Sequence, residues 1–410
     1  MASLTATKTE WTVQDLKARL DREEPFFILD VRNRDEFEAW KIEGRRPIPT
    51  HNIPYFEILE QGGADDVVES VIAYARRELV HWLPKDQPIL VVCAKGGTSA
   101  LVAEGLRALG YEAINLAGGT LAWSNFYDVK AIVEEPALSI YQVSRPARGC
   151  LSYIIASNGE AAIVDPLRHT EQYLRFAEEK GLNIWLILDT HAHADHISGG
   201  SHLSKQLGVP YYMHPYDGIH PIDVLPARLD YQPLWDGQQF RVGEATIETI
   251  HIPGHTLGNV VYLVHRRYLL TGDSIFIESI ARPDLGGRGD TWAPIHYHSL
   301  RKLLSLPDEV VVLPGHFSSL READENGVFA MTLGELKRRN EGLVMAQRGE
   351  NEFVEYILSS LPVFPPQYVD IKRVNAGLLI PDEEKASELE LGKNICALAQ
   401  AYQQGQDSSG

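Results

Sequence analysis

The seven residues 190–196, Thr-His-Ala-His-Ala-Asp-His, constrain the fold more than any other part of this chain. Imidazole nitrogens and carboxylate oxygens are the usual protein ligands of zinc and non-haem iron. The segment follows the apolar run 184–188, which indicates a buried strand, and it leads into a glycine-containing turn. Four ligand-type residues at one strand end predict a metal site rather than a polar surface loop.

Ligand-type residues also follow three later apolar runs. His255 comes after a predicted strand that ends at His251, Asp273 comes after the run 268–270, and His316 comes after the run 310–313. A glycine stands directly before each of them, and glycine lets the backbone turn sharply beside an ion. The ordered set therefore predicts that several strand ends converge on one metal centre.

The length of 410 residues predicts two or three domains. Between residues 10 and 130, short apolar runs alternate with helical spacing, which predicts a small α/β domain with a largely parallel sheet. A helix is predicted over 99–109, ending at Gly110. The predicted strands there are 26–30, 89–92 and 114–116.

Residues 131–148 carry prolines and weak periodicity, so they are predicted to be a linker. The second domain is expected over 149–400, strand-rich to about residue 320 and helical beyond it, which suggests a layered sandwich. Residues 403–410 form a polar tail. The predicted strands are 151–156, 161–165, 185–189, 245–251, 260–264, 268–270 and 310–313, with a helix at 171–180.

Cys93 lies between a predicted strand and a predicted helix, in a loop that contains two glycines. Backbone N–H groups at the positive end of a helix stabilise an anionic sulfur, and Lys95 adds positive charge. Cys93 is therefore predicted to be catalytic. The substrate-binding loop residues are expected to be Lys95, Gly96, Gly97 and Thr98.

The first 130 or so residues resemble a rhodanese, or sulfurtransferase, domain. Asp30-Val31-Arg32 with 35–37 matches an early family segment, and 118–123 matches a late one. The six-residue loop from Cys93 has the length that the family uses for sulfur chemistry. Ala94 stands where members that use thiosulfate often have Arg, so the resemblance implies a different preferred donor.

Residues 140–400 resemble the metallo-β-lactamase superfamily on the strength of the metal motifs. The resemblance implies an αββα sandwich with the metal site at one edge of its two sheets. In the hydrolase members two metals are bound. By resemblance, one would lie on His191, His193 and His255, and the other on Asp195, His196 and His316, with Asp273 bridging.

Two branches of this superfamily fit the residues. Glyoxalase II is a two-zinc thioester hydrolase in which metal-bound water is the nucleophile. Persulfide dioxygenase keeps the same residues but binds one Fe(II), by resemblance on His191, His255 and Asp273. In that branch the remaining residues would surround the iron rather than bind it: His193, Asp195, His196 and His316.

Segments 253–259 and 281–285 are similar to those of persulfide dioxygenases. Arg282 is predicted to meet a substrate carboxylate or persulfide, or alternatively to pair with Asp284. Both branches usually follow the last histidine with an acid and a tyrosine, whereas Phe317 and Ser318 follow here. This departure puts the glutathione-type substrate contact in doubt and leaves the thiol carrier open among glutathione, coenzyme A and others.

The fusion predicts an Fe(II) persulfide dioxygenase joined to a sulfurtransferase: one domain carries sulfur on Cys93 and the other consumes persulfide. The expected reactants and products are a low-molecular-weight thiol persulfide, O2, sulfite and thiosulfate. The alternative is a two-zinc hydrolase of glyoxalase II type with an accessory rhodanese domain. A third hypothesis is a sulfur carrier or sensor with a vestigial metal site.

The net charge of −18 argues against a nucleic-acid partner, which would need clustered Lys and Arg. No apolar run is long enough to span a membrane and no secretory leader is evident, so a cytoplasmic location is expected. Of the three cysteines, Cys150 and Cys396 are predicted to be buried structural thiols. The family resemblance implies a homodimer or higher oligomer.

Overall fold

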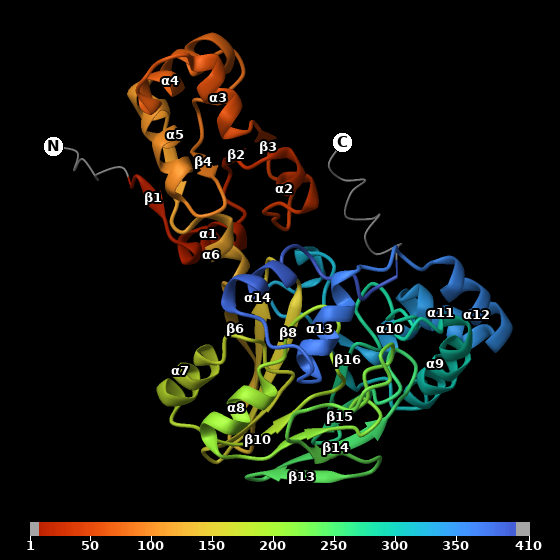
Figure 1. Ribbon diagram of the computed structural model, residues 1–410. Coiled ribbons are helices and arrows are strands. Elements are labelled where there is room, and N and C mark those ends of the chain that lie inside the picture. The colour runs from red at the N-terminus through yellow and green to blue at the C-terminus, as the bar shows by residue number, and fades with distance from the viewer. Residues whose placement is uncertain (1–7, 399–410) are drawn as a thin grey trace. The chain divides into compact units, whose positions relative to one another are not determined.

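The computed structural model describes residues 8–398. The chain divides into two compact domains, with the boundary between Phe126 and Tyr127 (Figure 1). The polar tail predicted at 403–410 lies outside the described residues. Within residues 8–398, none of the helices combines the length and the apolar character needed to cross a membrane.

The N-terminal domain is built on a five-stranded sheet in the order β1-β5-β4-β2-β3, and every neighbouring pair is parallel. Its strands are β1 (Glu10–Trp11), β2 (Phe27–Asp30), β3 (Thr50–Asn52), β4 (Ile89–Val92) and β5 (Ala113–Leu116). Its helices are α1 (Val13–Asp21), α2 (Arg34–Ala39), α3 (Tyr55–Gly62), α4 (Val67–Tyr74), α5 (Gly97–Ala108) and α6 (Gly119–Ser124). The predicted parallel α/β domain is confirmed.

The central strands β2, β4 and β5 are buried along their whole length, because helices cover both faces of a parallel sheet. On one face, Val71 of α4 and Leu106 of α5 pack into the same cluster as Leu29 and Val91. Parallel strands present their carboxyl ends at one edge, so the residue after β4 enters the edge loop. That residue is Cys93.

The C-terminal domain contains two mixed sheets. The first has seven strands in the order β12-β11-β10-β9-β8-β7-β6, and the second has six in the order β13-β14-β15-β16-β17-β18. The first comprises β6 (Asp128–Glu135), β7 (Leu138–Arg145), β8 (Cys150–Ser157), β9 (Glu160–Val164), β10 (Asn183–Leu188), β11 (Tyr211–Met213) and β12 (Gln232–Pro233). The second comprises β13 (Gln239–Val242), β14 (Ala245–His251), β15 (Val260–Val264), β16 (Tyr268–Gly272), β17 (Val311–Pro314) and β18 (Met331–Thr332).

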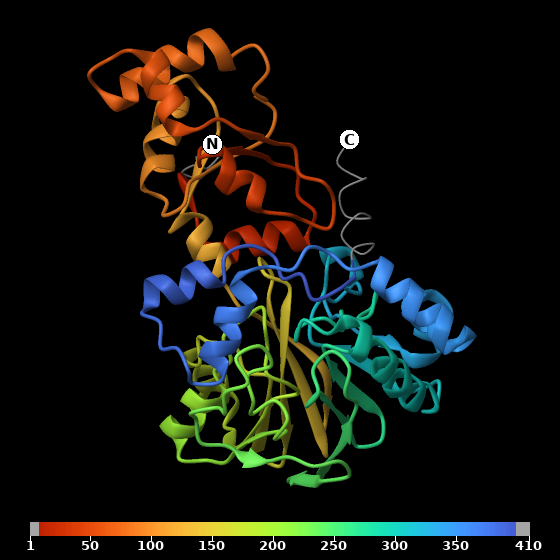
Figure 2. The same cartoon turned by 45° about the vertical axis from the view of Figure 1, so that its right-hand side comes forward.

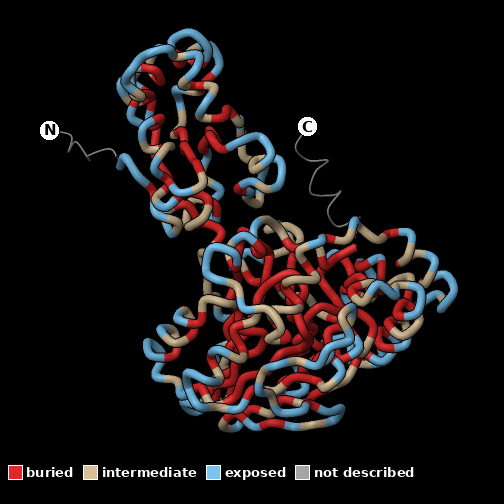
Figure 3. The backbone as a smooth tube through the Cα atoms, viewed as in Figure 1, coloured by how far each residue is buried: buried red, intermediate tan, exposed pale blue. Residues whose placement is uncertain are grey.

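The two sheets stack face to face, with helices on both outer faces (Figure 2). Side chains from both sheets, such as Leu186 and Ile247, share one buried cluster between them. Tyr173 of α7 (Glu171–Lys180) and Leu203 of α8 (Gly200–Leu207) pack on the outer face of the first sheet. Leu300 of α9 (Gly289–Leu304) packs on the outer face of the second. This is the predicted αββα sandwich, and its buried interior is visible in Figure 3.

The linker predicted at 131–148 is wrong. Most of that stretch belongs to β6 and β7, which pair antiparallel as the edge hairpin of the seven-stranded sheet. Pro136 lies in the hairpin turn and Pro146 follows β7, so both prolines mark strand ends. β7 is almost wholly buried between its neighbours, which hides the alternation by which a strand is usually recognised.

After β18 the chain is helical, as predicted, and part of it returns to the metal motif. The helices are α10 (Leu333–Arg339), α11 (Glu341–Arg348), α12 (Glu350–Ser359), α13 (Gln367–Asn375) and α14 (Glu383–Leu389). From α13, Lys372 donates to the carbonyl of Ala192, and Asn375 donates to the carbonyls of His193 and His196. These bonds hold a loop that has no regular secondary structure of its own.

Candidate functional site

The ligand-type residues of the C-terminal domain lie in loops that follow strands β10, β14, β16 and β17. The structure brings all of them to one place and buries each almost completely: His191, His193, Asp195, His196, His255, Asp273 and His316. Buried imidazoles and carboxylates need partners, because an unpaired polar group away from water is costly.

Each of the five histidines has one ring nitrogen held by a neighbour and one without a hydrogen-bond partner among the described residues. The held nitrogens are Nδ1 of His191 (3.0 Å to Thr190 Oγ1), Nε2 of His193 (3.2 Å to Asp165 Oδ1), Nδ1 of His196 (3.2 Å to Asp195 Oδ1), Nδ1 of His255 (2.7 Å to the Arg282 carbonyl) and Nδ1 of His316 (2.5 Å to Asp273 Oδ1). This pattern is typical of metal-binding histidines, whose second nitrogen is anchored by the protein. The donor set therefore fits bound metal.

The ligand atoms fall into separate groups. His191, His255 and Asp273 place one ligand atom each within 4.8 Å of one another. Asp273 Oδ2 lies 3.8 Å from His191 Nε2 and 3.5 Å from His255 Nε2. Ligands about 2.0–2.2 Å from one ion lie roughly 3 to 3.6 Å apart. This group, the triad, needs only a slight contraction to hold an ion.

A second group consists of Cys150, Asp195, His196 and His316, again with ligand atoms within 4.8 Å of one another. Cys150 is buried, as predicted for a structural thiol, but its Sγ lies 3.5 Å from Asp195 Oδ2. Cys396, also predicted to be a core thiol, falls into a further group with Asp195, Asp273 and His316. Both cysteines are buried in hydrophobic clusters as predicted, and their sulfurs also lie close to the metal-binding loops.

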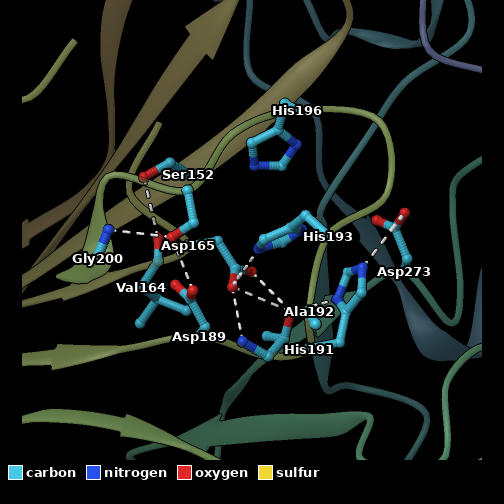
Figure 4. A network of polar contacts seen from close by, with 12 residues as sticks. Ser152, Val164, Asp165, Asp189, His191, Ala192, His193, His196, Gly200 and Asp273 are labelled. Carbon is cyan, nitrogen blue, oxygen red and sulfur yellow. Dashed lines mark hydrogen bonds and ion pairs between the residues drawn. The ribbon is translucent and has the colours of Figure 1, made fainter. Parts of the chain in front are cut away.

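His193 is held by residues that the sequence analysis did not single out. Asp165, directly after β9, accepts hydrogen bonds from the Thr190 amide at 2.6 Å and from His193 Nε2 at 3.2 Å (Figure 4). Asp165, Asp189 and His193 form their own candidate ligand group, apart from the triad. Asp165 could have been suspected from its position, because it follows a buried strand as Asp273 does.

The pKa values of the histidines are shifted in opposite directions in the two ligand groups. Burial, reinforced by neighbouring histidines, holds the pKa of His191 well below its usual range, and burial also lowers the pKa of His255. Both are therefore neutral and ready to bind a cation. Burial opposes charge on His196 as well, but Asp195 outweighs it and raises the pKa of His196 to about 10. Asp195 and Asp273 likewise raise the pKa of His316.

A cavity of about 320 Å³ opens beside the triad. Ala192 and Thr256, each next in sequence to a triad histidine, form part of its wall, and Trp292 adds an apolar surface. Two cationic residues also line it: Lys372, which is buried, and Arg288, which is exposed. Burial lowers the pKa of Lys372.

Lys372 was missed by the sequence analysis, although a signal existed. The buried positions of α13 are Tyr368, Ile371, Lys372 and Asn375, which is the spacing of one helix face. A lysine and an asparagine on that buried face indicate a partner beyond simple packing.

Arg282 does not reach this cavity, so its predicted role in substrate binding is wrong. Its guanidinium is fully buried and donates to both oxygens of Asp284, at 2.7 and 2.8 Å. It also donates to the carbonyl of Pro362 at 3.0 Å. The alternative of an ion pair with Asp284 holds, and the backbone of Arg282 instead anchors His255 through its carbonyl.

In the N-terminal domain, the Cys93 sulfur sits at the start of α5. It accepts hydrogen bonds from the amides of Gly96 at 3.1 Å and Ser99 at 3.4 Å. Ser99 Oγ lies 3.2 Å from the sulfur and 2.7 Å from Asn115 Oδ1, so its one proton serves one of them at a time. Ser99 and Asn115 were not predicted as site residues.

The other predicted loop residues differ in their exposure to solvent. Gly96 is buried at a φ of 85°, Lys95 and Gly97 are exposed, and Thr98 is half-buried. Gly119 packs so closely beneath the loop that a Cβ there would come within 2.3 Å of the Cys93 carbonyl oxygen. Only glycine fits that position, which explains the Gly-Gly pair at the start of α6.

Comparisons with known proteins match both domains. The model of the metallo-β-lactamase superfamily matches residues 145–316, and that of the rhodanese-like domain matches residues 12–126. The probable metallo-hydrolase YqgX of Bacillus subtilis (strain 168) is 32% identical over 43% of this chain and 90% of its own length. The hydroxyacylglutathione hydrolase of Pelagibacter ubique (strain HTCC1062) is 27% identical over 60% of this chain and 96% of its own length.

Among solved structures, a metallo-β-lactamase from Staphylococcus aureus subsp. aureus COL superposes with a TM-score of 0.52 at 27% identity. The match covers 60% of this chain and 74% of that one. The superfamily match ends at His316, so it includes every histidine and aspartate of the metal centre.

Proposed function

Because the chain belongs to the metallo-β-lactamase superfamily and carries a rhodanese-like domain before it, we propose that it is an Fe(II)-dependent persulfide dioxygenase coupled to a sulfurtransferase. The observation that carries this proposal is the separate grouping of His191, His255 and Asp273. Two histidines and one carboxylate on one face are the ligand set of non-haem Fe(II) oxygenases. One iron per chain is expected there.

Fe(II) held by the triad would supply the redox chemistry that lets dioxygen react with a persulfide sulfur. In the overall reaction, a thiol persulfide, O2 and water give the free thiol, sulfite and two protons. The terminal sulfur is oxidised, O2 is reduced, and the S–S bond breaks. The proposed substrate is the persulfide of a low-molecular-weight thiol.

The cavity residues support an acidic thiol carrier. Lys372 places a buried ammonium group beside the triad, and Arg288 lies at an exposed part of the wall. Trp292 and Leu257 give the carrier an apolar surface to pack against. A carboxylate or phosphate on the carrier would pair with these cations while the sulfur end approaches His191 and His255.

Cys93 supports the coupled sulfur transfer. Its sulfur accepts two backbone hydrogen bonds, which stabilise a thiolate or a persulfide anion. Transfer of the outer sulfur from a Cys93 persulfide to sulfite would give thiosulfate and the free cysteine. Sulfite is therefore proposed as the compound that links the two reactions, and thiosulfate as the product of the second.

The second candidate function is a two-zinc thioester hydrolase with an accessory rhodanese domain. It is favoured by the second ligand group, which would hold another metal, and by the likeness to a hydroxyacylglutathione hydrolase. It requires His193 as a ligand of the first metal. In the structure His193 Nδ1 lacks a hydrogen-bond partner, so it offers a ligand atom, but His193 does not group with the triad.

One experiment separates the two functions. The full-length protein, loaded anaerobically with iron, should consume O2 on addition of a small-thiol persulfide and release sulfite. The His191→Ala variant should lose iron, whereas His193→Ala should keep it. If the protein instead hydrolyses a glutathione thioester without consuming O2, and both variants lose metal alike, the hydrolase is the correct function.

A further inference from the structure

The segment between β11 and β12 carries a group of large apolar side chains on its surface. Over residues 216–225, the exposed ones are Tyr216, Ile219, Ile222, Val224 and Leu225. Among the described residues, the other large apolar side chains that are exposed lie apart from one another along the chain. Single exposed apolar residues are ordinary, whereas a group of them marks a binding surface.

Hydrogen bonds hold this segment in place, so the exposure of its side chains is not the result of fraying. The His220 amide donates to the Leu225 carbonyl at 2.9 Å, and the Val224 amide donates to the His220 carbonyl at 2.8 Å. The buried His220 ring accepts from the Asp223 amide through Nδ1 at 3.0 Å, which leaves Nε2 to donate to the Val369 carbonyl of α13 at 3.3 Å. The apolar side chains therefore stand on a closed, anchored turn.

Val224 is strained within this turn. Its φ of 55° lies in the left-handed region, which a β-branched residue rarely adopts. Its side chain is nevertheless 74% exposed and so gains little from packing within the protein. Strained residues that persist in an otherwise well-held segment point to function. An exposed, strained valine is therefore best explained by a ligand that its side chain contacts.

The exposed group forms part of the wall of the cavity beside the triad. Tyr216, Ile219 and Val224 line this cavity together with Leu257, which is also exposed. Lys372 lines it too, but Lys372 is buried and donates to a carbonyl of the metal loop at 2.7 Å. The cavity thus extends from a buried cation near the metal loops to an apolar rim in contact with solvent.

We propose that Tyr216, Ile219, Val224 and Leu257, here called the apolar lip, bind the carbon chain of the thiol carrier. The inference rests on the proposed persulfide oxidation and narrows its substrate. With the sulfur at the triad, an aliphatic chain lies along the lip, and an anionic end group pairs with the exposed Arg288 of the same cavity. The preferred substrate is therefore the persulfide of a thiol with an aliphatic body and an anionic end.

The first test uses the persulfides of ω-mercapto derivatives of propionate, hexanoate and octanoate, which differ only in chain length. For the iron-loaded wild type, kcat/KM of oxygen uptake should rise about twofold for each added methylene, since the lip covers the chain in part. Val224→Ser and Ile219→Ser should flatten this rise. Leu207→Ser, which removes an exposed leucine at the end of α8, should keep it. An equal slope in all four proteins, or none in wild type, would overturn the proposal.

Val224→Gly separates the ligand contact from folding. Glycine adopts a φ of 55° without strain, so the Tm of this variant should not fall, whereas the dependence on chain length should be lost. A Tm several degrees below that of wild type would show that the valine side chain serves folding, and the proposal would be wrong.

Binding can also be measured without turnover. Methyl thioethers of the same thiols have no S–S bond that could exchange with Cys93, so titration calorimetry of the anaerobic iron-loaded protein gives their Kd alone. The Kd should fall with chain length in wild type but not in Val224→Ser. If it does, and the persulfides cause no oxygen uptake, the lip is correct and the proposed dioxygenase is wrong.

Two other results would show that the lip meets a different surface, and either would overturn the inference. In the first, wild type sediments with phosphatidylcholine vesicles and Val224→Ser does not. In the second, wild type is an oligomer by analytical ultracentrifugation and Val224→Ser is a monomer.

Discussion

The carboxylate of Asp217 accepts a hydrogen bond from the backbone amide of Ala192 at 2.7 Å. The same side chain accepts from Thr256 Oγ1 at 2.7 Å and from the Gly258 amide at 2.9 Å. Asp217 therefore joins the loop that carries His191 to the loop that carries His255. Neither histidine is in a regular element, so the hydrogen bonds of Asp217 help to fix the spacing between them.

We expect Asp217→Asn to weaken iron binding at the triad by about tenfold or more, as is typical when a residue supporting metal ligands is changed. The amide group can still accept one bond but offers an N–H where another donor now points. Competition with a chelator measures the effect. Asp223→Asn, a change at a partly exposed ion pair with Arg373, is the control and should bind iron as wild type does.

Lys372 should govern substrate affinity more than turnover. We expect Lys372→Met to raise KM for an acidic thiol persulfide by about tenfold and to change kcat less, because an ion pair with the carrier is present before and during the reaction. Steady-state oxygen uptake gives both constants. Lys302→Met removes a cation from the surface pair with Asp236 and should leave both constants unchanged; an equal KM in the two variants would contradict this role.

Ser99 should affect the sulfur chemistry of Cys93 without affecting the metal centre. Its hydroxyl lies 3.2 Å from the sulfur, so Ser99→Ala removes a potential donor to the anionic form. We expect sulfur transfer to sulfite to slow by about tenfold or more, by analogy with other donors to developing anions. Ser70→Ala removes a buried hydroxyl in α4 that bonds the Ala64 carbonyl, and should transfer sulfur normally.

Glu390 should make the stability of the C-terminal domain depend on pH. Burial opposes its ionisation, but Arg145 and Arg168 together lower its pKa from 4.5 to about 2. A lowered folded pKa means that the stabilisation is complete above pH 4.5 and is lost as the pH falls from there through 2. Glu390→Gln should cost on the order of 3 kcal/mol at neutral pH and much less near pH 2.

Hydrogen exchange of peptides from the C-terminal domain, followed in increasing urea, measures this difference. Glu383→Gln is the matched control because Glu383 also pairs with Arg168 but is 74% exposed. An exposed pair contributes at most about 1 kcal/mol. A pH-independent gap between Glu390→Gln and wild type would show that the carboxylate charge is not the stabilising feature.

The sequence predicted the strands and metal residues that follow one rule: a short apolar run forms a buried strand, and a ligand-type residue comes soon after it. Strands β4, β9, β10 and β14 were recognisable as apolar runs, and the metal residues were recognisable because each follows such a run. β6 and β7 were not, because β6 is partly exposed without a regular alternation and prolines stand in the turn between the two strands and directly after β7.

The residues that support the site were hard to predict for a different reason. Asp217 and Lys372 bond backbone atoms of the metal loops, and nothing in their own neighbourhood specifies that partner. Arg282 was assigned to the substrate because of its charge, whereas its fully buried side chain is satisfied by Asp284 and three carbonyls. Long-range hydrogen bonds of this kind depend on the complete fold.

The bonds from α13 and the end of α14 to the loop at 190–196 also set an order of events during synthesis. Asn375 bonds the carbonyls of His193 and His196, and Glu390 bonds the amide of Ile197, about 180 to 190 positions earlier in the chain. A ribosome releases the motif long before it releases these partners. The Cys93 domain has all its sheet strands by Leu116, so it can fold during translation, whereas the metal loops gain their final restraints only after Glu390 emerges. The complete set of restraints on the metal loops therefore requires that nearly the whole C-terminal domain has been synthesised.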